Sequence, residues 1–293
     1  MPWLQLRIET QREHSNALEE ALLSAGAASV TIQDNADQPI LEPAVGETPL
    51  WQQVQITGLF DAEIDTSQTT VIVIAAFGNS LPTYRWELLE DKDWERAWMD
   101  NFHPMCFGKR LWICPSWKQP PEPTAVNLML DPGLAFGTGT HPTTALCLQW
   151  LDAINFDGKT VIDYGCGSGI LGIAALLLGA AEVFAIDNDP QALTATLSNA
   201  ERNNIDTSRI HTYLPGQLPN KTKADFVIAN ILAGPLIELA PLISELTQTG
   251  GQLVLSGIIK SQSDTLIKHY SPFFKMDDPA EQEDWLRLTG IKF

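Results

Sequence analysis

The sequence predicts an α/β protein in two parts, a smaller α+β module followed by a larger domain built on a parallel sheet. The chain has 293 residues, and at about 150 residues per domain that length predicts two domains. Residues 1–100 hold 17 acidic and 5 basic side chains, whereas residues 101–293 hold 19 and 13. From residue 142 onward, strand-like and helix-like segments alternate, which is typical of a parallel sheet with helices on both faces.

The smaller module is predicted to span residues 1–92 and to have the βαββαβ order of a ferredoxin-like sandwich. Its first strand, Trp3–Glu9, shows the alternation of a half-buried strand. The second helix is rich in β-branched residues, which leaves helix and strand both open for that segment. The predicted strands are 3–9, 30–33, 53–60 and 84–90, and the predicted helices are 15–25 and 67–77.

A short linker helix, 93–104, is predicted to end at His103-Pro104, because the residue before a proline disfavours helical backbone. The larger domain then spans residues 105–293. Two strands, 110–114 and 126–131, flank a proline-rich turn. Seven further strands are predicted at 160–164, 183–187, 210–213, 226–229, 251–256, 273–276 and 285–289, with helices at 142–154, 170–178, 190–203, 235–246 and 262–270. In such a sheet, ligands bind at the carboxyl ends of the strands.

Composition argues against several classes of protein. The net charge of −18 disfavours a protein that grips nucleic acid through its phosphates, because such proteins need a basic face. Four cysteines, none at CxxC spacing, favour reduced thiols in a cytoplasmic protein and no metal site. No signal peptide is expected at the amino terminus. The longest apolar stretch, 170–181, is too short to span a membrane.

The strongest functional signal is the segment VIDYGCGSGIL at 161–171, in which a buried strand runs into three alternate glycines before a helix. Glycine lets the backbone turn sharply and approach a ligand closely, and the free N–H groups of a helix start favour polar or anionic atoms. A dinucleotide fingerprint needs a glycine three residues after Gly167, where this chain has Ile170. The GxGxG spacing instead indicates a methyltransferase that uses S-adenosylmethionine, with Gly165 and Gly167 at the cofactor.

The next strand ends in a carboxylate, Asp187, 22 residues after Gly165. An acid at this place accepts hydrogen bonds from both hydroxyls of a ribose. Asp189 stands directly before Pro190, which is typical of a helix N-cap followed by proline at the first helical position. We therefore predict a binding role for Asp187 and a structural role for Asp189.

A third segment, DPGLAFGTGTHPTT at 131–144, contains a flexible Gly-Thr-Gly-Thr loop before a helix. It is either a loop capped by Thr140 or a lid over the cofactor, with threonine hydroxyls meeting the cofactor's polar tail. His141 is either a structural residue at the helix start or a base.

A fourth segment, ADFVIANILAGP at 224–235, delivers Asn230 from a hydrophobic strand to the edge of the sheet where ligands gather. Its amide oxygen there accepts hydrogen bonds from an attacking amine. The alternative is an asparagine that caps the following helix.

These four segments together resemble the bacterial ribosomal protein L11 methyltransferases, and the likeness covers nearly the whole chain. The quoted runs are DPGLAFGTGTHPTT, DYGCGSGILGIAA, IDNDPQA and ANILAGPL. The resemblance implies a Rossmann-like domain of seven strands and cofactor contacts at Thr144, Gly165, Asp187 and Asn230. It also implies S-adenosylmethionine as methyl donor, and methylation of the N-terminal α-amine and of lysine side chains of the ribosomal protein, which the N-terminal module presents.

Three other functions stay open on the sequence. The first is another amine N-methyltransferase, acting on a small molecule or a nucleic-acid base. The second is a nicotinamide dehydrogenase, which the glycine spacing disfavours. The third is a non-catalytic module that has kept only the fold.

Overall fold

A computed structural model describes residues 2–38, 40, 48–89, 102–131 and 141–293. Contacts divide the chain into two compact units, Met1–Asp100 and Asn101–Phe293. This division falls inside the predicted linker, 93–104, and most of that linker, with its predicted helix, lies outside the described residues. In the described part of the chain, every helix is too short or too polar to span a bilayer.

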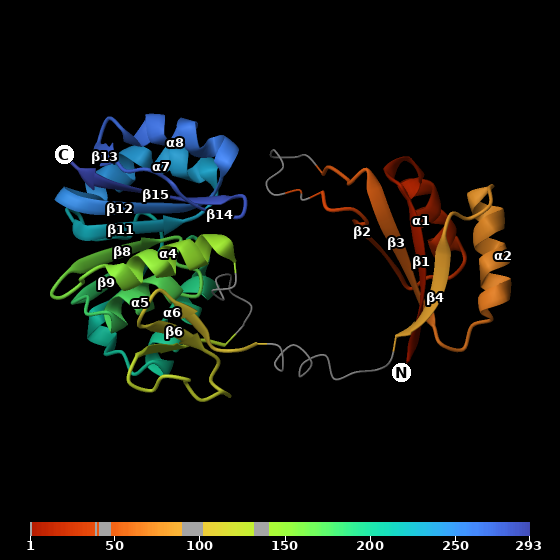
Figure 1. Cartoon of the computed structure of the whole chain (residues 1–293), viewed down its shortest axis with the longest axis horizontal. Coiled ribbons are helices and arrows are strands. Elements are labelled where there is room, and N and C mark those ends of the chain that lie inside the picture. The colour runs from red at the N-terminus through yellow and green to blue at the C-terminus, as the bar shows by residue number, and fades with distance from the viewer. Residues whose placement is uncertain (1, 39, 41–47, 90–101, 132–140) are drawn as a thin grey trace. The chain divides into compact units, whose positions relative to one another are not determined.

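The N-terminal unit has the predicted βαββαβ order, and its sheet is antiparallel with the strand order β2-β3-β1-β4 (Figure 1). Its elements are β1 (Trp3–Gln11), α1 (Ser15–Ser24), β2 (Ser29–Asp34), β3 (Gln53–Asp61), α2 (Thr66–Phe77) and β4 (Tyr84–Leu89). Alternate residues of β1, such as Leu6 and Ile8, are buried in a core with Leu18 and Leu22 of α1. The segment left open between helix and strand is the helix α2, whose N-cap Asp65 accepts hydrogen bonds from the N–H groups of the first turn.

The larger unit is built on a sheet with the strand order β10-β9-β8-β11-β12-β15-β13, and β14 pairs with β15. The strands from β10 to β12 are mutually parallel. They are β8 (Thr160–Tyr164), β9 (Glu182–Ile186), β10 (Ile210–Tyr213), β11 (Ala224–Asn230) and β12 (Thr247–Ile259). The seven predicted strands are all present.

The sheet is parallel, as the alternation of elements indicated, only as far as β12, and its last strands are mixed in direction. β15 (Trp285–Lys292) runs antiparallel to β12 and to β13 (Phe274–Met276). The short connection between β13 and β15 explains the difference. It contains only β14 (Ala280–Gln282) and no helix, whereas a parallel neighbour needs a crossover of a dozen or more residues.

Helices cover both faces of this sheet, as predicted (Figure 1). One face packs against α4 (Pro142–Ala153), α5 (Ile170–Leu177) and α6 (Pro190–Arg202). The other face packs against α7 (Ala233–Leu246) and α8 (Ser263–Tyr270). A separate small sheet contains β5 (Met105–Phe107), β6 (Leu111–Cys114) and β7 (Val126–Met129), of which β5 was not predicted.

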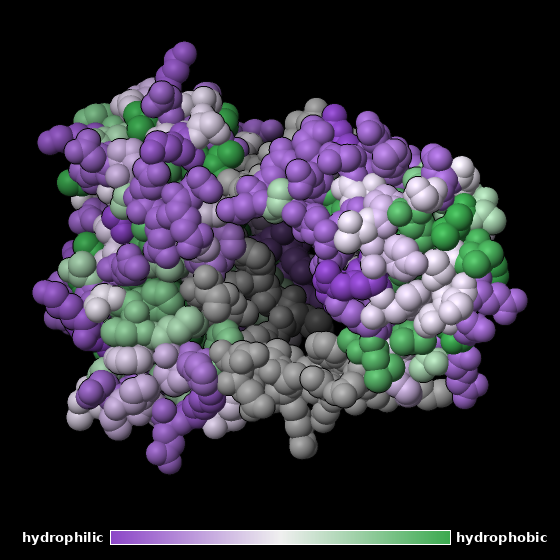
Figure 2. Space-filling model, turned by 45° about the vertical axis from the view of Figure 1, so that its right-hand side comes forward, coloured by the Kyte–Doolittle hydropathy of each residue, from purple (hydrophilic) through white to green (hydrophobic). Residues whose placement is uncertain are grey.

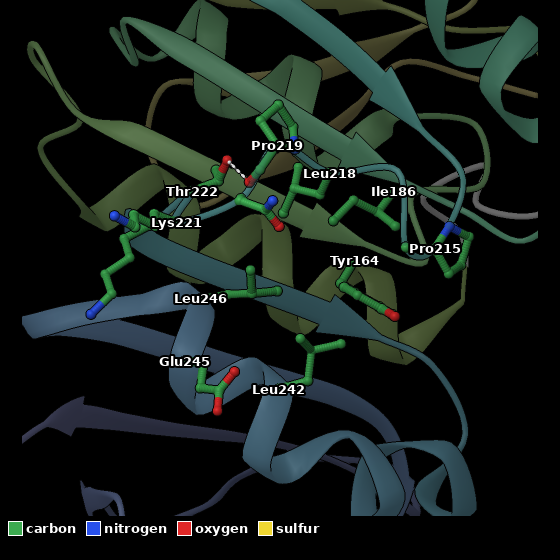
Figure 3. Close-up of a pocket in the computed structure, with 13 residues that line it drawn as sticks. Tyr164, Ile186, Pro215, Leu218, Pro219, Lys221, Thr222, Leu242, Glu245 and Leu246 are labelled. Atoms are coloured by element: carbon green, nitrogen blue, oxygen red, sulfur yellow. Dashed lines mark hydrogen bonds between the residues drawn. The ribbon is translucent and has the colours of Figure 1, made fainter.

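The connection from β10 to β11, residues 214–223, contains no helix. A cavity of about 540 Å³ lies beneath it on the α7 face of the sheet (Figure 3). Its wall is mainly apolar, with Tyr164, Ile186, Leu242 and Leu246, and Lys221 also lines it. None of the predicted site residues lines this cavity.

Candidate active site

The five residues predicted to contact a cofactor line one cavity of about 240 Å³. It lies where β8, β9 and β11 end, at the carboxyl edge of the parallel strands. The lining residues are Thr144, Gly165, Cys166, Gly167, Ile170, Leu171, Asp187, Asn188, Asn230 and Ile231. The structure therefore brings together residues that are up to 87 positions apart in the sequence, at the edge of the sheet where doubly wound folds bind ligands.

The glycine loop is tied to the neighbouring strand and pressed against the next loop. The N–H of Gly165 donates to the carbonyl oxygen of Ile186 over 2.7 Å. Gly165 has a φ of 77°, and a Cβ there would lie 2.2 Å from Cγ2 of Ile231. Only glycine fits this conformation and this space, so the backbone itself forms part of the cavity wall.

The carboxylate of Asp187 bridges the glycine loop and the start of α6. Its Oδ2 accepts from the N–H of Gly167 over 2.9 Å, and its Oδ1 accepts from the N–H of Asp189 over 3.0 Å. A carboxylate has about four acceptor positions, so two remain for hydroxyl donors in the cavity. Asp189 is the N-cap of α6, with its Oδ1 accepting from the N–H of Gln191 over 2.8 Å, and the structural role predicted for it is confirmed.

Asn230 is oriented by a residue from a distant helix. Its Nδ2 donates to the hydroxyl of Thr144 over 3.2 Å, which directs the amide nitrogen toward α4. The Oδ1 of Asn230 has no hydrogen-bond partner among the described residues. The alternative of a capping asparagine is wrong, because the N-cap of α7 is Leu232.

His141 is the N-cap of α4, and Thr140, named as a possible cap of the loop, lies outside the described residues. Its Nδ1 lies 2.8 Å from the hydroxyl of Thr143, and the N–H of Thr143 donates to it. Its ring packs edge-on against Trp285, with 4.7 Å between the centroids. Burial lowers the pKa of His141, and the nearby Glu283 partly offsets this. The predicted lid, residues 132–140, lies outside the described residues.

Asp163, at the end of β8, is buried beneath the glycine loop and is only 1% exposed. The pKa of Asp163 is raised to about 7, mainly by burial and also by the charge of Asp187, although the Gly172 N–H, which donates to Oδ2 over 2.9 Å, lowers it. Burial likewise raises the pKa of the nearby Cys147 and Cys166 thiols. Thiols with raised pKa values are poor nucleophiles, so the site offers no activated cysteine.

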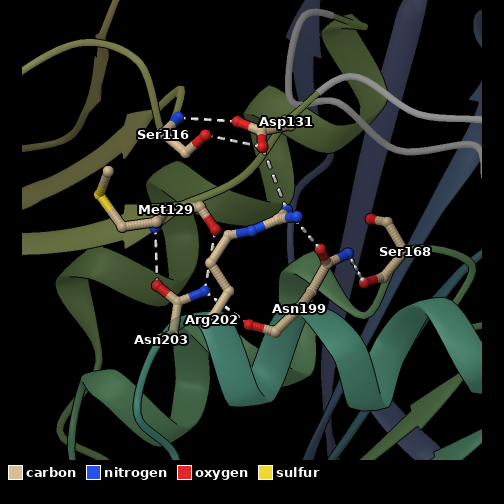
Figure 4. Close-up of polar contacts among 7 residues, drawn as sticks. All are labelled: Ser116, Met129, Asp131, Ser168, Asn199, Arg202 and Asn203. Atoms are coloured by element: carbon tan, nitrogen blue, oxygen red, sulfur yellow. Dashed lines mark hydrogen bonds and ion pairs between the residues drawn. The ribbon is translucent and has the colours of Figure 1, made fainter.

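The carboxyl end of α6 holds the glycine loop and the small sheet together (Figure 4). Asn199 donates from Nδ2 to the carbonyl oxygen of Ser168 over 2.9 Å. Arg202 donates to Oδ1 of Asn199 over 3.1 Å and pairs with Asp131 over 3.5 Å. The sequence reasoning missed these residues. The available signal was a polar residue on the buried face of a predicted helix, because buried polar groups require partners.

Gly257, in β12, is a second residue that the sequence reasoning missed. Its φ is 85°, and a Cβ there would lie 2.4 Å from the carbonyl oxygen of Ile231. A side chain at this position would displace Ile231, which lines the cavity and follows Asn230. No local pattern in the sequence marks this glycine, since its constraint comes from Ile231, which directly follows the neighbouring strand β11.

The strand order, the glycine loop after β8 and the acid after β9 define the class of this protein as an α/β methyltransferase preceded by a small antiparallel domain. A model of the ribosomal protein L11 methyltransferase family (PrmA) matches residues 2–292, and the chain belongs to that family. Methyltransferases of this class take the methyl group from S-adenosylmethionine.

Curated relatives match the chain over its full length. The ribosomal protein L11 methyltransferase of Cellvibrio japonicus is 60% identical over 292 residues, which are 100% of this chain and 99% of the relative. That of Escherichia coli (strain 55989 / EAEC) is 56% identical over 298 residues, covering 100% of both. Among solved structures, the ribosomal protein L11 methylase of Lactobacillus delbrueckii subsp. bulgaricus is 33% identical and covers 65% of this chain and 99% of its own, with a TM-score of 0.60.

Proposed function

We propose that this chain transfers methyl groups from S-adenosylmethionine to amines of ribosomal protein L11, and that the 240 Å³ cavity at the ends of β8, β9 and β11 binds the methyl donor. The observation that carries the assignment of the site is the pair of free acceptor positions on Asp187, beside a loop whose Gly165 admits no side chain. Asp187 accepts the hydrogen bonds of the ribose hydroxyls. Gly165 and Gly167 let the donor lie against the backbone, and Thr144 closes the same wall.

Asn230 is proposed to position the acceptor amine. The donor supplies an electrophilic methyl group on a sulfonium, and transfer is an in-line displacement in which positioning does most of the work. Because the Nδ2 of Asn230 donates to Thr144, its Oδ1 is left to accept a hydrogen bond from the amine. That hydrogen bond strengthens as the amine gains positive charge during transfer, so it lowers the barrier to the reaction.

The acceptor amine must be neutral to attack the methyl group, and the free-energy cost of deprotonating it depends on its pKa. At pH 7.4 a lysine amine of pKa about 10.4 is neutral roughly one time in a thousand, a cost of about 4 kcal/mol, whereas an α-amine of pKa near 8 costs under about 1 kcal/mol. Desolvation in the site lowers an amine pKa. We therefore propose that no single side chain is an essential base, in agreement with the N-cap position of His141.

We further propose that the methylated groups are the N-terminal α-amine and lysine side chains of the ribosomal protein. Residues 1–92 are proposed to form the module that recruits this substrate. The 17 acidic residues among the first 100 favour attraction of a basic protein. We propose that the enzyme works in the cytoplasm, in agreement with its four free cysteines.

The test of the function is methyl transfer with labelled donor to ribosomal protein L11, RNA, DNA and small amines. We expect label on the ribosomal protein, and mass spectrometry to identify which of its amines carry the methyl groups. Label on RNA, DNA or small amines alone would contradict it. A truncated enzyme that lacks residues 1–92 tests recruitment, and an unchanged rate on the ribosomal protein would refute that part.

A further inference from the structure

Helix α2 leaves three of its branched aliphatic side chains exposed and buries two threonines beside Val73. Val71, Ile72 and Ile74 are 64%, 43% and 36% exposed, while the buried residues of the helix are Thr69, Thr70 and Val73. A surface helix ordinarily turns its apolar stripe toward the core. Val73 is in the core of the unit and Phe77 packs against that core, which holds the helix in place, and Asp65 caps its first turn.

The buried hydroxyl of Thr70 in α2 has both its partners within the unit. Thr70 donates to the carbonyl oxygen of Thr66 over 2.7 Å and accepts from the indole nitrogen of Trp86 over 3.0 Å. Nothing in these contacts requires the exposed aliphatic side chains of α2. They are therefore available to a partner.

The edge strand β4, whose Trp86 donates to Thr70 of α2, also exposes apolar side chains. Tyr84 and Leu88, 45% and 60% exposed, lie two residues either side of Trp86 and so on the same face of β4. Figure 2 shows hydrophobic side chains gathered on the surface of the N-terminal unit. We call Val71, Ile72, Ile74, Tyr84 and Leu88 the α2 patch. Contiguous exposed apolar patches of this kind mark interaction sites.

The charges nearest the α2 patch in the sequence are acidic except for Arg85 of β4, which pairs with Glu9 and Glu87. Asp61, Glu63 and Asp65 directly precede α2 and are all exposed. Between Arg12 and Arg85 the sequence contains no lysine or arginine. Acidic charge repels the phosphates of nucleic acid and the anionic surface of a membrane, and it repels a second copy of this acidic chain. It attracts a basic protein that carries its own apolar patch.

We propose that the α2 patch is the docking surface for the basic ribosomal protein substrate, an inference that rests on the proposed function. The apolar side chains supply the contact, and the acidic residues before α2 orient the approach. Because this surface belongs to the N-terminal unit and not to the methyl-transfer cavity, it acts on capture of the whole substrate and not on the chemical step.

The test is steady-state methylation by the full-length double variant Val71→Gln/Ile72→Gln. Glutamine favours helix at least as well as the residues it replaces, and thermal unfolding checks that the fold is kept. With intact ribosomal protein, the expected result is a KM raised about tenfold or more with kcat within about twofold. With a short peptide of the substrate's first residues, kcat/KM is expected to stay unchanged. The matched control, Ile291→Gln, changes a residue 44% exposed on the larger unit and is expected to leave all values unchanged.

A second variant, Leu88→Gln, tests the β4 part of the patch in the same way. If KM for the intact ribosomal protein is unchanged in both variants, the docking proposal is overturned. The proposed function still holds in that case, provided that the wild type methylates the ribosomal protein normally. If sedimentation shows a wild-type dimer that the variants dissociate, the patch is a self-interface and the proposal is also overturned. Failure of the wild type to methylate the ribosomal protein contradicts the proposed function instead.

Discussion

Replacing Asp187 with asparagine is expected to weaken binding of S-adenosylmethionine strongly. The carboxylate already accepts from the N–H groups of Gly167 and Asp189, over 2.9 Å and 3.0 Å, and the proposal gives its remaining positions to the two ribose hydroxyls. Asparagine puts an NH2 group in place of one oxygen, so at least one charged hydrogen bond is lost. Such a bond contributes about 1.5–3 kcal/mol, so Kd is expected to rise roughly 10- to 150-fold.

Isothermal titration calorimetry with the methyl donor and with its demethylated product measures this change. The matched control is Asp189→Ala, which removes the N-cap of α6. Loss of a cap costs about 1 kcal/mol of stability, and the Kd of this control is expected to stay within about twofold of wild type. If Asp187→Asn binds the donor as tightly as wild type while remaining folded, the assignment of Asp187 to the ribose is refuted.

Asn230→Ala is expected to lower kcat about 10- to 100-fold. Thr144→Val removes the hydroxyl that accepts from the Asn230 amide and is expected to lower kcat by a smaller factor. An unchanged kcat in both variants would contradict the proposal that Asn230 positions the amine. His141→Ala is expected to keep turnover, measured with labelled donor, and abolished turnover with intact cofactor affinity would show that it is an essential base. Because the folded pKa of Asp163 is raised to about 7, the folded state binds more protons than the unfolded state between about pH 4 and 7, and the unfolding free energy falls as pH rises through this range, by up to about 4 kcal/mol. Urea unfolding at pH 5 and 8 should show that Asp163→Asn removes this fall, and an equal dependence in both proteins would contradict the assignment.

The positions of site residues that lie at the end of a strand or in a local motif could be predicted from the sequence. Asp187 follows a short apolar strand, and Asp189 stands before Pro190, so their places followed from strand length and cap chemistry. The orientation of Asn230 was not predictable, because its amide is held by Thr144, 86 positions away. The same holds for Gly257, whose constraint comes from Ile231 in the loop after β11.

The fold was predictable wherever periodicity and connection length agreed. The strand Thr160–Tyr164 and the helix start at Pro142 lie where the sequence placed them. The antiparallel direction of β15 was not predicted. Alternating strands and helices indicate parallel pairing, but the connection between β13 and β15 is too short for a parallel crossover. The sequence left helix and strand open for α2 and did not show its exposed aliphatic face. Polar Thr69 and Thr70 are buried while Val71, Ile72 and Ile74 are exposed, so the hydrophobic period does not mark the buried side.

The assignment of the methyl-donor site is tested most directly by a crystal structure of the full chain with the demethylated product of S-adenosylmethionine. We expect ligand density in the cavity between Gly165, Asp187 and Asn230, with the ribose hydroxyls within hydrogen-bond distance of the Asp187 carboxylate. A ligand bound elsewhere, with that cavity empty, would contradict this assignment.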